Sequence, residues 1–130
     1  VYAKRFMAVT AHPEATRAAF DVLKSGGSAA DAAVAAQLVL NLVEPQSSGL
    51  GGGAFLVHWD AAAKSMRTYD ARERAPLAAG DDRLLLNGEP RDFMRTVASG
   101  LSVGVPGLAR GLERLAGVFL VGFGIRLGAQ

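Results

Sequence analysis

The sequence predicts an α+β fold in which helices pack on an antiparallel sheet. Residues 12–43 repeat apolar side chains at helical spacing, and residues 54–70 read as two strands joined by a turn. Two strands with this much apolar surface are too few for a complete sheet. We therefore expect the fold to be incomplete in this chain, with the missing strands in another part of the protein.

The first expected helix runs from His12 to Ser25. Its apolar residues fall on one side at helical spacing, and Pro13 suits the first turn. Gly26 and Gly27 then provide a stop. We expect His12 at the entrance of this helix.

The second expected helix covers residues 29–43. Ser28 and Asp31 form an S-x-x-D capping box, and the run that follows is apolar on nearly every face, which predicts a buried helix. A membrane span is not expected, because this run of roughly 15 residues, interrupted by Asp31, Gln37 and Asn41, is shorter than the ~20 apolar residues that a bilayer requires.

A glycine-rich loop and a β-hairpin follow. Residues 46–53 favour a tight, closely packed loop. The loop formally fits a G-x-G-x-x-A dinucleotide pattern, but it follows a helix and opens a strand, the reverse of the order that such a site needs. Residues 54–59 and 66–70 are the expected strands, joined by a turn at residues 60–64.

The remainder of the chain is expected to be mostly connection. Pro, Gly, Asp and Asn dominate residues 75–89, where Leu84 to Leu86 would anchor the segment to a core. Residues 100–107 favour an extended piece ending in a turn. A further helix is expected at residues 108–115.

Composition excludes several classes of function. The net charge is +2 with scattered basic residues, which gives no argument for nucleic acid. There is no cysteine, and His12 and His58 lack ligand spacing, so we expect neither a metal site nor a cofactor. Residues 1–7 carry no secretory signal, and because the chain starts at Val1 we expect its opening to be missing. The compartment does not follow from these features.

Four ordered motifs carry a family resemblance. Residues 26–35 read GGSAADAAVA, 44–55 read EPQSSGLGGGAF, 70–76 read DARERAP and 102–107 read SVGVPG. Together they resemble the signatures of γ-glutamyltransferases, also called glutathione hydrolases. Residues 1–117 are similar to the N-terminal part of that family's large subunit, whereas residues 118–130 form a divergent apolar tail.

The resemblance implies an N-terminal-nucleophile hydrolase with a four-layer αββα sandwich, of which this chain would hold a part. It further implies a γ-glutamyl donor such as glutathione and a separate small subunit whose N-terminal threonine attacks the donor. Acyl transfer then passes through a covalent intermediate, with backbone donors stabilising the oxyanion. A periplasmic or extracellular location would fit the family.

Arg72 is the substrate-binding residue that the resemblance implies, since the family's arginine of the R-E motif binds the donor α-carboxylate. A guanidinium offers a planar fork that matches a carboxylate. From the local sequence alone, Arg72 would instead be an exposed arginine at a strand end. Glu73 beside it is expected to order the site without a catalytic role.

No catalytic residue is expected within the chain. None of its four threonines, Thr10, Thr16, Thr68 and Thr96, stands in a T-T-H-x-S setting. We therefore expect the chain alone to be inactive. Two alternatives stay open: a related N-terminal-nucleophile acylase of the cephalosporin or poly-γ-glutamate type, and a non-catalytic truncated remnant.

Overall fold

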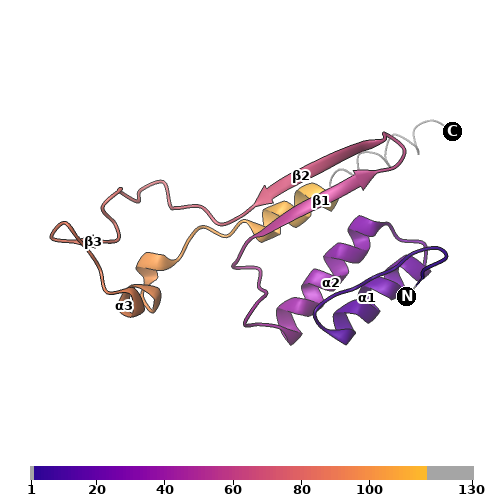
Figure 1. Ribbon diagram of the computed structural model, residues 1–130, viewed down its shortest axis with the longest axis horizontal. Helices are drawn as coiled ribbons and strands as arrows, with labels where there is room; N and C mark the ends of the chain where they lie inside the picture. Colours follow the sequence, from indigo (N-terminus) through magenta and orange to yellow (C-terminus); the bar gives the residue numbers. More distant parts are fainter. Residues whose placement is uncertain (1, 117–130) are drawn as a thin grey trace.

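The computed structural model describes residues 2–116 (Figure 1). Its α+β architecture, with helices beside an antiparallel hairpin, confirms the predicted fold class. The apolar tail at 118–130 lies outside the described residues. The elements are α1 (Pro13–Lys24), α2 (Ala29–Val43), β1 (Ala54–Asp60), β2 (Ser65–Ala71), β3 (Leu85–Leu86), β4 (Glu89–Pro90), α3 (Phe93–Val97), η1 (Gly100–Ser102) and a last helical stretch at 108–116.

Helix α1 begins and ends where the sequence predicts. The His12 side chain caps it, with Nδ1 accepting the Glu14 N–H at 3.2 Å, and Pro13 occupies the first turn. The chain leaves through Gly26 at φ 94°, in the left-handed region that glycine adopts without strain.

Helix α2 packs beside α1 through small side chains. The predicted capping box is present: Ser28 Oγ accepts the Asp31 N–H at 3.1 Å, and the Asp31 carboxylate accepts the Ser28 N–H at 2.9 Å. The buried cluster between the helices is made of Ala19, Ala32 and Ala36. The prediction of a helix buried all round is wrong at Leu38 and Leu42, which are 52% and 80% exposed, because no described element covers that face.

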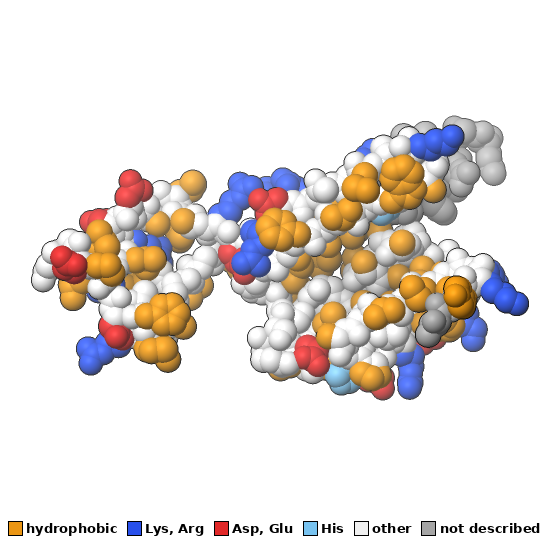
Figure 2. Space-filling view, in the orientation of Figure 1, with side chains coloured by type: hydrophobic (Ala, Val, Ile, Leu, Met, Phe, Trp, Pro, Cys, Tyr) orange, Lys and Arg blue, Asp and Glu red, His pale blue; other side chains and the backbone are white. Residues whose placement is uncertain are grey.

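Strands β1 and β2 form the predicted antiparallel hairpin, registered from Ala54 opposite Ala71 to Asp60 opposite Ser65. Alternation gives the hairpin two unlike faces. On one face, Leu56 and the buried Ala71 lie against Gly111 of the last helix. This helix also carries the buried residues Leu108, Leu112 and Leu115. The other face exposes the large apolar side chains of Phe55, Val57, Trp59 and Met66. Figure 2 shows apolar side chains exposed along the hairpin.

Residues 75–104 leave the hairpin and return to it as a small lobe (Figure 1). The predicted connection contains β3, β4 and α3, which are too short for periodicity to reveal. Leu84, Leu85 and Leu86 do not anchor it to a core, since all three are exposed. Instead the Arg83 guanidinium holds the lobe together by donating to the carbonyls of Leu101 at 2.8 Å and Gly100 at 3.0 Å.

The segment predicted as extended, residues 100–107, is extended only in its second half. Gly100–Ser102 forms the 3₁₀ turn η1, and Val105 then pairs with Arg74 in an isolated antiparallel bridge. The predicted last helix is present from residue 108. Within residues 2–116, no helix has the length and apolar character needed to cross a bilayer.

Candidate functional site

The glycine-rich loop between α2 and β1 is fixed at both ends. Near its start, the Gln37 side-chain amide of α2 donates to Ser48 Oγ at 2.6 Å and to Asn41 Oδ1 at 2.9 Å. Near its end, the Gly52 carbonyl accepts the N–H groups of Gly107 and Leu108, each at 3.1 Å. The loop is therefore held between α2 and the start of the last helix.

Arg72 is placed by the end of β2. The Asp70 carboxylate accepts the backbone N–H of Arg72 at 3.0 Å, two residues on, which is the pattern of an Asx turn. The turn stops the strand and directs the chain toward the glycine loop. The D-x-R spacing of the motif thus has a local structural cause.

Glu73 forms an ion pair with Arg72, with Arg72 Nη2 and Glu73 Oε2 3.1 Å apart. The two side chains are 52% and 31% exposed, so the pair is screened by solvent and its guanidinium keeps N–H groups free for a ligand. Gly53 lies directly against this ion pair: a Cβ at this position would lie 2.6 Å from Glu73 Oε2 and 2.7 Å from Arg72 Cα. The absence of a side chain at Gly53 allows the ion pair to sit against the loop.

Arg72 and Glu73 border a cavity of about 390 Å³ that the glycine loop and Gln37 also line. The same two side chains border a larger, more apolar cavity of about 750 Å³ that reaches the lobe through Phe93 and Val97. A cation, an anion and the glycine loop thus border a space large enough for an amino acid. This arrangement can hold a ligand that carries a carboxylate.

The predicted site residue and the predicted loop meet in this cavity, although they are 19 or more residues apart in sequence. Thr96 borders the larger cavity, but its hydroxyl donates to the Asp92 carbonyl at 2.7 Å. Thr10 and Thr16 bond one another at 2.8 Å near α1, away from Arg72. His12 lies at the N-terminus of α1 and His58 in β1.

Two contributions were not predicted from the sequence. Gln37 and Asn41 were interpreted only as interruptions of an apolar run, whereas they anchor the loop. The signal was available, because polar residues four apart lie on the same helix face. Phe55 was interpreted as a strand residue, yet its ring lies 6.0 Å from the Arg72 guanidinium carbon. Only the fold brings that ring near the arginine.

Comparison with known proteins gives one consistent family. The family model described as gamma-glutamyltranspeptidase matches residues 15–119. The glutathione hydrolase proenzyme of Bacillus subtilis is 49% identical over 108 residues, which cover 82% of this chain and 18% of that protein. Human glutathione hydrolase 7 is 40% identical over 105 residues, covering 81% of this chain and 15% of that protein.

Solved structures agree with these sequence matches. The gamma-glutamyltranspeptidase of Helicobacter pylori superposes with a TM-score of 0.81 at 34% identity, covering 88% of this chain and 33% of that one. The Bacillus anthracis transpeptidase CapD gives 0.65 at 30% identity, covering 85% and 32%. These neighbours confirm a partial N-terminal-nucleophile hydrolase fold. The chain spans less than a fifth of the length of the curated relatives described above.

Proposed function

This chain belongs to the gamma-glutamyltranspeptidase family, and from that membership we propose that it supplies the part of a γ-glutamyl acyl-transfer pocket that binds the donor's α-carboxylate. Residues 1–117 would be the N-terminal part of the large subunit. The donor would be glutathione or a related γ-glutamyl compound. Arg72 would bind its carboxylate.

The observation that carries this proposal is the position of Arg72. Arg72 borders a cavity of about 390 Å³ that the glycine loop also lines. Glu73 takes one side of the guanidinium at 3.1 Å, and the remaining N–H groups can form a fork with a carboxylate. Such charge-assisted hydrogen bonds typically contribute ~1.5–3 kcal/mol each.

The reaction would be acyl transfer. The attacking group would be a threonine hydroxyl of a separate small subunit. It would add to the γ-carbonyl carbon of the donor, and the amine would leave with the proton that the hydroxyl loses. Water or an amino acid would then take the acyl group from the threonine oxygen. The residues of this chain would bind and orient the donor, while backbone N–H groups would stabilise the oxyanion.

Binding of L-glutamate to the full chain tests the role of Arg72. We expect Arg72→Gln to weaken binding about tenfold or more, because a charge-assisted fork is lost. Arg72→Lys should recover only part of the affinity, since the ammonium keeps the charge without the planar fork. Arg67→Gln, which removes an exposed arginine in the middle of β2, is the matched control. Equal affinities for the native chain and Arg72→Gln would refute the proposed role.

Catalysis needs a separate test. The purified chain should release no product from a γ-glutamyl anilide above the buffer rate. Residues 15–116 exchanged into the glutathione hydrolase proenzyme of Bacillus subtilis should give an active enzyme, with kcat/KM reduced by Arg72→Gln. Turnover by the chain alone would show that it holds its own nucleophile.

A second candidate is a related N-terminal-nucleophile acylase. The weaker likeness to the Bacillus anthracis transpeptidase supports it. The exchanged enzyme distinguishes the two candidates: a preference for glutathione favours the first, and a preference for poly-γ-glutamate or a cephalosporin side chain favours the second.

A further inference from the structure

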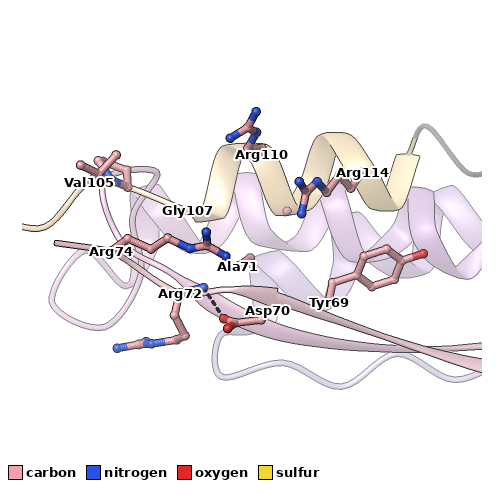
Figure 3. Close-up of a pocket in the computed structure, with 11 residues that line it drawn as sticks. Tyr69, Asp70, Ala71, Arg72, Arg74, Val105, Gly107, Arg110 and Arg114 are labelled. Carbon is pink, nitrogen blue, oxygen red and sulfur yellow. Dashed lines mark hydrogen bonds between the residues drawn. The ribbon is translucent and has the colours of Figure 1, made fainter. Parts of the chain in front are cut away.

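A separate small cavity lies at the seam between β2 and the last helix (Figure 3). Its volume is about 110 Å³, below the roughly 300–1,000 Å³ typical of pockets for drug-sized ligands. Arg74 borders it from the chain after β2, and Arg110 and Arg114 border it from the helix. A space of this size suits a single small ion.

Two of these arginines point into the same space. Figure 3 shows the guanidinium groups of Arg74 and Arg114 pointing toward one another, whereas the guanidinium of Arg110 points away from both. Arg72 also borders the cavity, but its guanidinium points away on the other side of the strand. Two guanidinium groups that the proposed acyl-transfer function does not use therefore converge on one space, and Arg110 borders it from the helix.

The backbone beneath these arginines is closely packed. Arg74 and Val105 exchange both backbone hydrogen bonds, at 3.1 and 2.7 Å. Gly111 lies between Arg110 and Arg114 and has no room for a side chain, because a Cβ there would collide with the Ala71 methyl group. The helix is thereby held against the end of β2, so the backbone positions of the three arginines are fixed relative to one another.

Close ion pairs are missing around this cavity. Between residues 2 and 116, the ion pairs closer than 4 Å are Arg17–Glu14 and Arg72–Glu73, and neither includes these three arginines. The Asp70 carboxylate borders the cavity and keeps its negative charge while its Oδ1 accepts the Arg72 N–H, but it forms none of these ion pairs. Arg110 and Arg114 also stand four residues apart on one helix, a like-charge spacing that is unfavourable. A bound anion would relieve this repulsion.

We propose that Arg74 and Arg114, with Arg110 beside them at the border of the cavity, form a binding site for a tetrahedral oxoanion, a phosphate or sulfate group. Guanidinium donors that approach from two different elements match several oxygens of a tetrahedral ion, whereas a single planar carboxylate is satisfied by one fork. The three side chains are exposed, so the affinity belongs in the millimolar range and falls with salt. The site is independent of the proposed role of Arg72.

Titration of the full ¹⁵N-labelled chain with inorganic phosphate, at constant ionic strength set by chloride, tests the site. We expect saturable shifts of the arginine Nε–H signals and of the backbone amides at residue 105 and residues 107–111. Arg110→Gln with Arg114→Gln should weaken the binding at least tenfold, and Arg74→Gln alone should weaken it measurably. Acetate should bind at least tenfold more weakly than phosphate.

A single substitution serves as the control. Arg67→Gln removes a positive charge elsewhere on β2 and should leave phosphate binding unchanged. The proposal is overturned if the shifts do not saturate, if acetate binds as tightly as phosphate, or if Arg67→Gln weakens binding as much as the double variant.

Discussion

Gly53 is the residue at which the glycine loop touches the Arg72–Glu73 pair. A methyl group there would lie 2.6 Å from Glu73 Oε2 and 2.7 Å from Arg72 Cα, so Gly53→Ala must displace the pair or the loop. We expect a loss of roughly 1–3 kcal/mol in the free energy of unfolding, as for an overpacked site. Chemical denaturation measures this loss, and L-glutamate binding should weaken with it.

Gly51→Ala is the matched control for this prediction. A Cβ at Gly51 meets no atom within 4 Å, and its φ is not among the positive values of the chain. The substitution should leave the free energy of unfolding unchanged or raise it by up to ~1 kcal/mol, because alanine leaves the unfolded chain less conformational freedom than glycine does. If Gly51→Ala lowered the free energy of unfolding as much as Gly53→Ala, loop flexibility and not contact with the ion pair would determine the loss of stability.

Gln37 anchors the same loop from α2. Gln37→Glu keeps the size of the side chain but replaces a donating amide with a carboxylate, so the hydrogen bond to Asn41 Oδ1 is lost and two acceptor oxygens face one another. We expect a loss of about 1–3 kcal/mol in the free energy of unfolding, because the half-buried Ser48 hydroxyl can donate to only one of these two acceptors. Thermal melting followed by circular dichroism measures it. A melting temperature equal to that of the native chain would contradict the anchoring role.

At the scale of single residues, the sequence led to Arg72 only through the family motifs. An arginine at a strand end is ordinary, and its placement on a cavity depends on the loop that α2 and the last helix hold opposite it. The approach of the Phe55 ring to the guanidinium depends on strand register. Neither feature is encoded within a short window of residues.

The N-terminus of α2 gives a prediction at the scale of an element. Ser28→Ala removes the hydroxyl that accepts the Asp31 N–H, and such cap substitutions typically cost about 1 kcal/mol. Urea denaturation followed at 222 nm measures the loss. Ser25→Ala, at the other end of the α1–α2 connection, is a control with a smaller expected effect, because its hydroxyl bonds only the Val22 carbonyl.

The same cap should make stability depend on pH. Hydrogen bonds from the Ser28 hydroxyl and the Ser28 N–H lower the pKa of Asp31 from its ordinary value of 3.8. A lowered pKa in the folded chain means that the carboxylate stabilises the fold above pH 3.8, and that this contribution is lost as pH falls through the folded value. Asp31→Asn should therefore destabilise the chain at pH 7, and the difference from the native chain should shrink toward pH 2–3. A difference that is constant across this range would contradict the assignment.

Elements with strong periodicity or clear caps could be predicted from the sequence, and short ones could not. The α1 and α2 boundaries follow from Pro13, the glycine stop and the capping box. The β3–β4 hairpin and α3 contain two to five residues each, too few to show a period. Their shape depends on Arg83, which reaches carbonyls 17 and 18 residues away. The exposure of Leu42 was mispredicted because an apolar helix face indicates burial only where a partner element covers it.

At the scale of the whole molecule, the buried apolar side chains that the structure describes belong to alanines and to three leucines of the last helix, Leu108, Leu112 and Leu115. The α1–α2 cluster consists of alanines, and large apolar residues remain exposed on the hairpin. Phe55, Val57 and Met66 are 74%, 68% and 64% exposed, which is typical of a face that another layer covers. The expectation of an incomplete sheet rests on this same surface.

This surface predicts self-association of the isolated chain. Val57→Lys places a charge in the middle of the apolar face and should shift the sedimentation profile toward monomer at micromolar concentration. Val9→Lys is the control, since Val9 is 79% exposed but lies outside the sheet. If both substitutions change sedimentation equally, added charge and not the hairpin face is responsible.

The backbone bridge between Arg74 and Val105 has a consequence for how such chains can vary. It closes the excursion of residues 75–104 at its base, so the lobe begins and ends at one point of the scaffold. Insertions, deletions or wholesale replacement within that excursion can alter the rim of the larger cavity while Arg72 keeps its position. Selection could thus remodel this lobe freely without disturbing the guanidinium two residues before its base.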